Sequence, residues 1–203
     1  MTSRKLHYVA DPMCSWCWGF HSELETIRAE LPTDLELEFV MGGLAIDSGA
    51  PMPAEVRGYV QQAWREVQSR TGAEFNWDFW EKCEPRRSTY PSCRAVIAAG
   101  LSGSEHERAM FEALQRAYYL EARNPSLEET LIEVAGETGL DRAKFAEDLR
   151  SSQVEELFRE HRALRRALGA NSFPSLMLEE ANGEVRCVMR GSGTASEVLS
   201  AIQ

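Results

Sequence analysis

The sequence has no long apolar segment and no excess of positive charge. No stretch of its 203 residues approaches the roughly 20 apolar residues that a membrane-spanning helix requires. The chain carries 32 Asp and Glu against 22 Lys and Arg, a net charge of −10, and such a surface repels phosphate backbones and anionic lipid headgroups. We therefore expect neither nucleic acid nor a membrane as a partner.

The first residues also lack the pattern of an export signal. The sequence passes from Met-Thr-Ser-Arg-Lys directly into a strand-like run, without the apolar core of about 7–15 residues that such a signal contains. We therefore expect the protein in the cytoplasm. In a reducing compartment, a close pair of cysteines is typical of a redox or metal role and not of a structural disulfide framework. The five cysteines are Cys14, Cys17, Cys83, Cys93 and Cys187.

Hydrophobic periodicity predicts a strand, a helix and a second strand at the start of the chain. Residues 5–10 and 35–40 alternate as strands do, and residues 14–31 between them have apolar side chains at helical spacing. From about residue 49 the helical spacing continues through several segments as far as residue 151. Ser126 and Ser152 each have Glu three residues later, which is the spacing of a capping box.

The last fifty residues predict a helix, a hairpin and a closing helix. A helix over 152–168 ends at Gly169, and strands over 175–178 and 185–189 flank an Asn-Gly pair that favours a tight turn. Residues 194–202 predict the closing helix. The two ends of the chain together therefore predict an α/β unit with about a hundred helical residues inserted between its halves.

The chemistry is expected at Cys14-Ser15-Trp16-Cys17, where the first strand turns into the first helix. Residues three apart on a helix lie on one face about 5–6 Å apart, which a disulfide can bridge. Cys14 would lie in the first turn, where free backbone amides and the helix dipole stabilise a thiolate, so we predict it as the nucleophile. Cys17, one turn deeper, would keep its proton longer and act as the resolving thiol.

The stretch Asp11-Pro12-Met13-Cys14-Ser15-Trp16-Cys17-Trp18-Gly19 resembles the DsbA-like branch of the thioredoxin superfamily, and within it the cytoplasmic FrnE-like group described as disulfide isomerases. Gly42-Gly43-Leu44 and Phe173-Pro174-Ser175-Leu176 are similar to the same group. The resemblance implies an α/β thioredoxin fold with a large all-helical insertion between its second strand and the following helix. It implies a thioredoxin-like domain over 1–48 and 152–203 and an inserted helical domain over 49–151.

The resemblance also implies thiol–disulfide exchange on protein or small-molecule disulfides, with the cysteine pair as the redox group and no further cofactor. The periplasmic oxidant of this branch carries Pro-His between its cysteines, whereas this chain carries Ser15-Trp16. The missing histidine cation removes one source of thiolate stabilisation. We therefore expect reductase or isomerase activity and not strong oxidation.

A substrate-binding rim is predicted around the nucleophile. In a thioredoxin-like arrangement, Phe173-Pro174 is expected to form a cis peptide and to present the backbone of Phe173 beside Cys14 to an extended substrate. Trp16 is expected to be exposed and Trp18 buried. The predicted substrate-binding residues are Met13, Ser15, Trp16, Phe173 and Pro174.

The other cysteines are mostly expected to be small buried side chains. Cys93 is the exception to consider, as an accessory thiol that faces the active site or pairs with Cys83. Cys83 and Cys93 also offer two more thiolates for a zinc site with the first pair, but nine residues separate them, unlike the two to four of a zinc knuckle. No metal is therefore expected, and Cys187 is expected in the core.

Two other functions remain open at this point. The first is a glutathione-dependent transferase or isomerase similar to the kappa class, which also inserts helices into a thioredoxin core but typically has Ser where Cys14 stands. Glutathione is accordingly also considered as a co-substrate. The second is a non-catalytic thiol adaptor or zinc-stabilised binding module. No oligomeric state is assigned.

Overall fold

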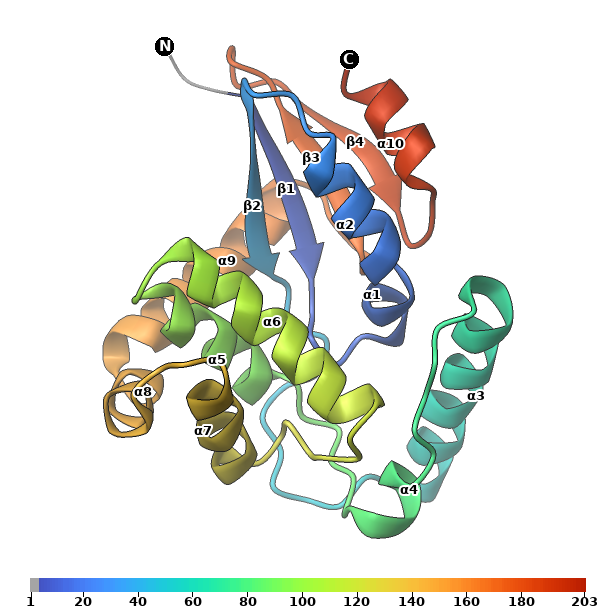
Figure 1. The fold of residues 1–203 in the computed structure, drawn as a ribbon, viewed down its shortest axis with the longest axis vertical. Helices are drawn as coiled ribbons and strands as arrows, with labels where there is room; N and C mark the ends of the chain where they lie inside the picture. The colour runs from blue at the N-terminus through green and yellow to red at the C-terminus, as the bar shows by residue number, and fades with distance from the viewer. Residues whose placement is uncertain (1–3) are drawn as a thin grey trace.

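Residues 4–203 of the computed structural model form a four-stranded mixed sheet surrounded by helices (Figure 1). The strand order is β2-β1-β3-β4, with β1 parallel to β2 and antiparallel to β3, and β3 antiparallel to β4. The strands are β1 (Arg4–Ala10), β2 (Leu35–Met41), β3 (Ser175–Glu179) and β4 (Val185–Arg190). The helices are α1 (Ser15–Gly19), α2 (His21–Ala29), α3 (Ala54–Thr71), α4 (Phe79–Lys82), α5 (Tyr90–Gly100), α6 (Ser104–Tyr119), α7 (Glu128–Glu137), α8 (Arg142–Leu149), α9 (Ser152–Ala167) and α10 (Ala195–Ala201).

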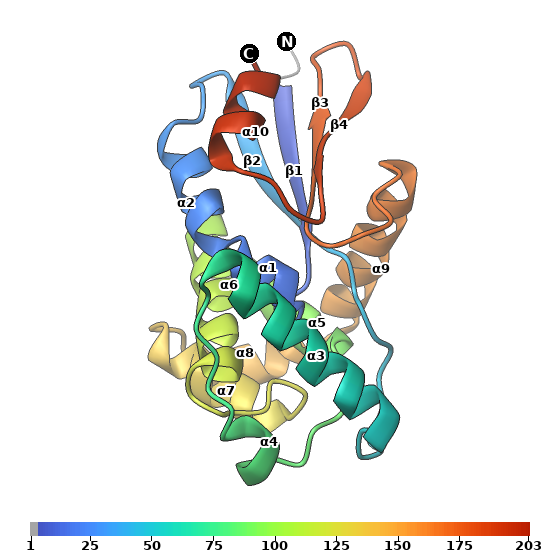
Figure 2. The same ribbon diagram turned by 90° about the vertical axis from the view of Figure 1, so that its right-hand side faces the viewer.

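The helices fall into two groups around the sheet. Figure 2 shows α2 and α10 on one face of the sheet and α9 on the other, and α2 packs against α10 while α9 packs against β2. Helices α3 to α8 lie beyond the carboxyl ends of β1 and β2 (Figure 1). The loops that leave these two strands therefore run directly between the sheet and the second group of helices.

The sheet and the inserted helices share one buried core. Leu6 and Tyr8 of β1 belong to the same cluster of buried side chains as Val96 of α5 and Phe111 of α6. The Tyr8 ring meets the rings of Phe39 and Phe111 edge to face, with centroids 5.4 and 6.0 Å apart. The division into domains at residues 48/49 and 151/152 stays a prediction, since the two parts are packed around common side chains.

The helix predicted over 14–31 is in fact two helices. Helix α1 ends at Gly19, and Phe20 stands between α1 and α2 with φ −90° and ψ −2°. Gly19 lies against α3, where an added Cβ would be 2.6 Å from Val67 Cγ1 and 3.1 Å from Thr71 Cγ2. Glycine therefore permits the close approach of α3, and it also weakens the continuation of a helix.

The two predicted capping boxes are wrong. Ser126 lies outside α7 with its hydroxyl bonded to a buried backbone carbonyl, and α9 is capped by Ser151 instead of Ser152. Glu155 stands three residues after Ser152 and favoured that serine in the sequence, but Ser151 caps the helix by accepting from Val154 N–H. The full capping box of Thr194 and Glu197 opens α10, and each side chain there bonds the backbone of the other.

The predicted hairpin is confirmed, but the predicted burial of Cys187 is wrong. β3 pairs with β4 across the Asn-Gly turn, with a register shift between Leu176 and Met177. β4 is the edge strand, and Cys187 is exposed on it. Alternation in the sequence predicted a buried face that this edge strand does not have over most of its length.

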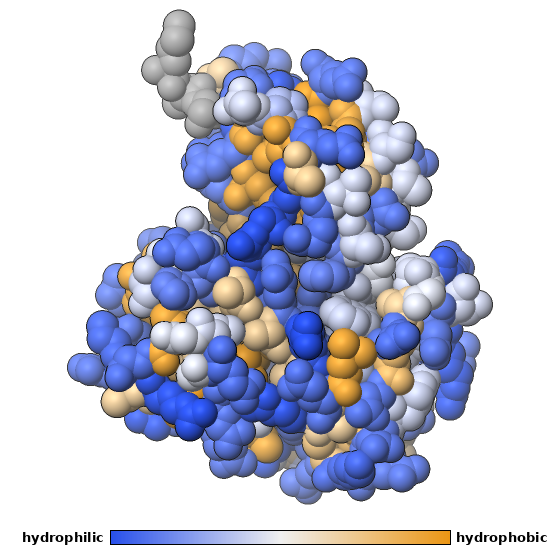
Figure 3. All heavy atoms as spheres, viewed as in Figure 1, coloured by the Kyte–Doolittle hydropathy of each residue, from blue (hydrophilic) through white to orange (hydrophobic). Residues whose placement is uncertain are grey.

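The surface agrees with the composition. Figure 3 shows a largely hydrophilic face on which hydrophobic residues gather in small groups. In the part of the chain that the structure describes, no helix combines the length and the hydropathy needed to cross a membrane.

Candidate active site

Cys14 and Cys17 lie where β1 passes into α1, between the sheet and the second group of helices (Figure 1). Cys14 is the N-cap residue of α1, in an extended conformation with φ −85° and ψ 115°. Its backbone N–H donates to the Asp11 carbonyl at 3.0 Å, and its carbonyl accepts from Trp18 N–H at 3.1 Å. Cys17 is fully buried one turn further along α1. This arrangement brings the two thiols within hydrogen-bond distance of each other.

The two thiols differ in how readily they ionise. The hydrogen bond from the Cys17 thiol lowers the pKa of Cys14, helped by the backbone amides of Cys17 and Trp16 and opposed by burial. Burial raises the pKa of Cys17 well above its ordinary value, and the neighbouring Cys14 raises it further. Cys14 is therefore the thiol of the pair that loses its proton first.

Cys14 is buried, and only 6 % of it is accessible. It is reached through a groove of ≈ 160 Å³ between the cysteine loop and α3. Access to the sulfur is therefore controlled by the walls of this groove. Its lining includes Met13, Ser15, Trp16, Leu44, Tyr59, Ala63, Arg87 and Phe173.

The loop before β3 forms one wall of the groove. The Phe173–Pro174 peptide is cis, as predicted. The Cys14 thiol donates a long hydrogen bond of 3.7 Å to the Phe173 carbonyl. The Phe173 ring lies against Gly42, where a Cβ would be 2.0 Å from the ring, and under the Arg165 guanidinium at 5.3 Å from the ring centroid. These contacts fix the Phe173 backbone beside the sulfur.

Four of the five residues predicted to bind substrate line this groove, and the fifth does not. Pro174 is buried behind the groove, and its carbonyl accepts from Gly191 N–H at 2.7 Å. Roles for all five in substrate binding stay predictions. The four that line the groove are Met13, Ser15, Trp16 and Phe173.

The predicted contrast between the two tryptophans is wrong, because Trp16 and Trp18 are both half-buried. The Trp18 ring stacks on Tyr119 with centroids 5.6 Å apart, and its indole N–H donates to the Glu74 carbonyl at 2.9 Å. Trp16 stands between the groove and a second pocket. The exposure of both tryptophans is set by packing against the inserted helices. The local sequence does not show this packing.

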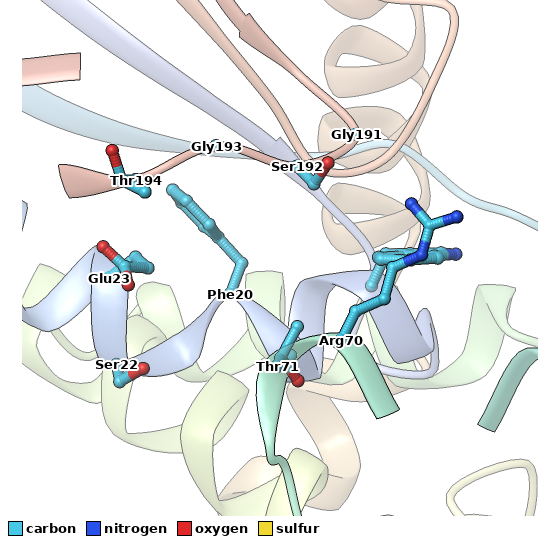
Figure 4. Close-up of a pocket in the computed structure, with 11 residues that line it drawn as sticks. Phe20, Ser22, Glu23, Arg70, Thr71, Gly191, Ser192, Gly193 and Thr194 are labelled. Carbon is cyan, nitrogen blue, oxygen red and sulfur yellow. The ribbon is translucent and has the colours of Figure 1, made fainter. Parts of the chain in front are cut away.

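The second pocket shares Trp16 with the groove but is not lined by Cys14, and it has a volume of ≈ 340 Å³ (Figure 4). Its walls are α1 and α2, the end of α3 with Arg70 and Thr71, and the loop 191–194 before α10. The Arg70 guanidinium lies 5.5 Å from the Trp16 ring centroid. Sequence reasoning missed this pocket, because its walls come from three distant segments that only the fold brings together.

A buried carboxylate lies under the cysteine loop, and sequence reasoning missed this as well. Asp11 is fully buried and accepts from Met13 N–H at 2.8 Å, Leu44 N–H at 2.7 Å and the Thr89 hydroxyl at 2.6 Å. The Cys93 thiol lies 3.5 Å from the same carboxylate. Burial raises the pKa of Cys93 well above its ordinary value. Cys93, the predicted accessory thiol, therefore faces Asp11 and does not line the groove.

Cys83 and Cys93 are not joined. The half-buried Cys83 donates from its thiol to the Ala122 carbonyl at 2.9 Å, in a different cluster from Cys93. Over residues 4–203, no group of three or more His, Cys, Asp and Glu side chains is placed to hold a metal ion. The two alternatives that place Cys83 and Cys93 together, a second redox pair and a four-thiolate zinc site, therefore have no geometric support.

The comparisons with known proteins agree with this geometry. A family model described as Thioredoxin matches residues 7–193. The chain belongs to the thioredoxin family. This thioredoxin-family chain is similar to a candidate protein disulfide isomerase from Nitrosomonas europaea, with a TM-score of 0.88 and 26 % identity over 99 % of this chain and 96 % of the other. The predicted α/β thioredoxin fold of the DsbA-like type is confirmed.

Two further relatives bear on the function of this thioredoxin-family chain. The cytosolic disulfide reductase DsbM from Pseudomonas aeruginosa, solved also with GSH, has a TM-score of 0.76 and 29 % identity over 91 % of this chain and 89 % of its own. The ClpXP adapter protein SpxH from Halalkalibacterium halodurans is 26 % identical over 76 % of this chain and 52 % of its own length. The chain thus spans about half the length of the curated relatives it matches.

Proposed function

We propose that this chain catalyses dithiol–disulfide exchange through Cys14 and Cys17, in the direction of disulfide reduction. The observation that carries the proposal is a groove that leads to one thiol with a lowered pKa, while the second thiol lies behind it, buried and hydrogen-bonded to the first. The similarity to a protein named as a cytosolic disulfide reductase supports the direction. A reducing cytoplasm, expected from the sequence, would keep the pair as the dithiol between turnovers.

The reaction takes place in two displacements. The Cys14 thiolate attacks one sulfur of the substrate disulfide, a mixed disulfide forms, and the other substrate sulfur leaves as a thiolate that takes a proton from water. Cys17 then loses its proton and attacks Cys14 Sγ, which forms the Cys14–Cys17 disulfide and releases the second substrate thiolate. The substrate gains two electrons and two protons, and the protein pair is oxidised by the same two electrons.

The mouth of the groove suits a polypeptide disulfide. Leu44 and Tyr59 are large apolar side chains that line the groove and are exposed, and Tyr59 is 69 % accessible. Isolated exposed apolar residues are common, but a group at the entrance to a reactive thiol marks an interaction site. The fixed backbone of Phe173 beside Cys14 offers a hydrogen-bonding edge to an extended segment of the substrate.

Glutathione is the co-substrate we propose for returning the pair to the dithiol. Two glutathione thiols would reduce the Cys14–Cys17 disulfide and leave as glutathione disulfide, which balances the electrons. The pocket beside Trp16 has a size suited to a tripeptide, and Arg70 supplies a cation for one of its carboxylates (Figure 4). The structure of DsbM with GSH supports this assignment, since DsbM is similar to this chain over most of its length.

The proposal is tested by trapping the mixed disulfide. The Cys17→Ser variant, mixed with a disulfide-containing peptide, should accumulate a peptide–Cys14 adduct that mass spectrometry detects, because the resolving thiol is gone. The matched Cys14→Ser variant should form no adduct. Adducts of equal yield in both variants, or none in either, would remove Cys14 as the nucleophile.

A second candidate function is that of an adapter, which the curated relatives named as ClpXP adapter proteins favour. In that case the thioredoxin-like fold would serve as a binding module and exchange chemistry would be dispensable. The double variant Cys14→Ser/Cys17→Ser separates the two. Binding of this variant to purified ClpXP with the affinity of the unmodified chain would support the adapter, whereas absence of binding by either form would exclude it.

A further inference from the structure

The groove that leads to Cys14 contains one cationic side chain, that of Arg87. Within the part of the chain that the structure describes, no other Asp, Glu, Lys or Arg lines it. The remaining lining residues are neutral, and most of them are apolar. Because the chain as a whole has a net charge of −10, the charge beside the reactive thiol is opposite in sign to that of the protein.

The guanidinium of Arg87 has no partner of its own. Across residues 4–203, its side chain makes no hydrogen bond, ion pair or aromatic ring contact. Arg165, which contacts the groove residue Phe173, is by contrast engaged, because it donates to the Gly42 carbonyl at 3.1 Å and lies over the Phe173 ring. A half-buried cation without a counter-charge is costly. A single polar group in an apolar site is typical of a group that orients a ligand.

The backbone on both sides of Arg87 is fixed by hydrogen bonds to other segments. The Pro85 carbonyl accepts from Met52 N–H at 2.7 Å. The Ser88 carbonyl accepts from the Ser126 hydroxyl, also at 2.7 Å. The base of the Arg87 side chain is therefore held in place, while its charged end is free to bind a partner.

The charge of Arg87 acts little on the nucleophile. The main influences on the pKa of Cys14 are the Cys17 thiol, burial, the nearby backbone amides and Asp11, and Arg87 is not among them. Burial raises the pKa of Tyr118, and the charge of Arg87 opposes that rise. The guanidinium therefore lies near the buried Tyr118 ring of α6, and its charge remains available to a substrate in the groove.

We propose that Arg87 selects substrates in which an Asp or Glu lies within about two residues of the disulfide-bonded cysteine. The inference rests on the function proposed above and names the substrate class. A guanidinium binds a carboxylate through two parallel hydrogen bonds, more strongly than it binds a neutral amide. A groove of ≈ 160 Å³ has room for roughly two or three residues of extended chain. The carboxylate that reaches Arg87 therefore belongs to a close neighbour of the cysteine that reaches Cys14.

The test compares peptide disulfides that differ only in one residue, Glu, Gln or Lys, placed one or two positions from the cysteine. With the unmodified chain and a fixed concentration of glutathione, kcat/KM should be about 3- to 10-fold higher for Glu than for Gln at one or more of these positions, and lowest for Lys. Arg87→Gln should bring the Glu-to-Gln ratio to about one, whereas Arg87→Lys should keep part of it.

Arg65→Gln is the matched control, because Arg65 lies over Trp77 and does not line the groove. This variant should keep the full Glu-to-Gln ratio. Equal rates for Glu and Gln at every position in the unmodified chain would overturn the proposal. A ratio that survives in Arg87→Gln would overturn it as well, and a higher KM for glutathione in that variant would then assign Arg87 to glutathione.

A measurement without any variant covers the case in which Arg87→Gln does not fold. Salt screens an ion pair at a partly exposed site, so the Glu-to-Gln ratio of the unmodified chain should fall about twofold or more when the ionic strength rises from about 0.05 to about 0.5 M. A ratio that is independent of salt would contradict the proposal. Failure of the proposed function is separate, because no peptide would then be reduced and Cys17→Ser would form no Cys14 adduct, whichever residue is next to the cysteine.

Discussion

Two buried regions of different character meet under the cysteine loop. On one side lies the polar contact of Asp11 with Thr89 and Cys93. On the other lies an aromatic cluster, in which Trp64 of α3 is fully buried with six rings at centroid distances of 4.9–5.9 Å. The first ties the cysteine loop to Leu44 and Thr89 through hydrogen bonds, and the second holds α3 in place as a wall of the groove. The six rings belong to Phe75, Trp77, Phe79, Trp80, Tyr118 and Tyr119.

The largest expected effect is on stability, and it comes from removing the central ring of the aromatic cluster. This variant tests whether the cluster contributes to packing alone. Trp64→Ala should lower the free energy of unfolding by about 3–5 kcal/mol, because it leaves a cavity among tightly packed rings. The pKa of Cys14 should change little, because Trp64 carries no charge and acts on the thiol only through its share in burying the groove. Denaturant unfolding and thiolate absorbance measure the two quantities. The half-buried Trp77 gives a control, and Trp77→Ala should cost clearly less. A large shift in the Cys14 pKa of Trp64→Ala would show that the two regions are not independent.

A smaller effect concerns a half-buried carboxylate, Glu107, which has no hydrogen-bond donor among the described residues. Burial, with the nearby Glu38, raises the pKa of Glu107 to about 7 from 4.5. The folded state thus holds this proton more tightly, so the contribution of Glu107 to stability is highest below pH 4.5 and falls as the pH rises to about 7, by about 1–3 kcal/mol. Glu107→Gln should remove this fall.

Chemical unfolding at several pH values checks the Glu107 prediction. The exposed Glu105 on the same helix supplies the control variant, Glu105→Gln, which should keep the slope of the unmodified chain. Asp11 accepts hydrogen bonds from several donors, whereas Glu107 accepts none among the described residues. The pH dependence of the free energy of unfolding would then show what the missing donors cost at Glu107. An unchanged slope in Glu107→Gln would mean that Glu107 is ionised in the folded protein at low cost.

The smallest expected effect lies at the edge of the aromatic cluster, where α3 carries Arg70 over Trp16. Arg70→Ala should raise the KM for glutathione by about 2- to 5-fold, as expected for a partly solvated ion pair. The kcat should hardly change, because Arg70 lines the second pocket and not the groove that holds Cys14. Arg65→Ala on the same helix, whose guanidinium lies over Trp77, is the matched control. Equal effects of both variants would argue against glutathione in this pocket.

Much of the fold could be predicted because its signals are local. Alternation gave β1 and β2 within a residue of their ends, and the Asn-Gly pair placed the hairpin of β3 and β4. The spacing of Cys14 and Cys17 placed them at the start of a helix after a strand, where the structure has them. Periodicity and turn chemistry depend on near neighbours, which a single sequence contains in full.

What could not be predicted depends on contacts between distant segments. Asp11 was visible only as a strand-breaking residue, because its partner Thr89 is 78 residues away in the chain. The short helix α4 has no periodicity to detect, and its place is set by the aromatic cluster. Arg70 becomes relevant only when α3 is laid beside Trp16. The contact of Cys93 with Asp11 and the exposure of Cys187 likewise follow from which helix is central and which strand is an edge.

The close packing of α3 against α1 depends on the absence of a side chain at Gly19. Because Val67 of α3 approaches to 2.6 Å from where a Cβ would stand, a larger residue at position 19 would force α3 outward. The same face of α3, one to two turns earlier, lines the groove in front of Cys14 with Val60, Ala63 and Trp64. The range of substrates that reach the sulfur could therefore change through a residue that never meets them, with every reacting group left as it is.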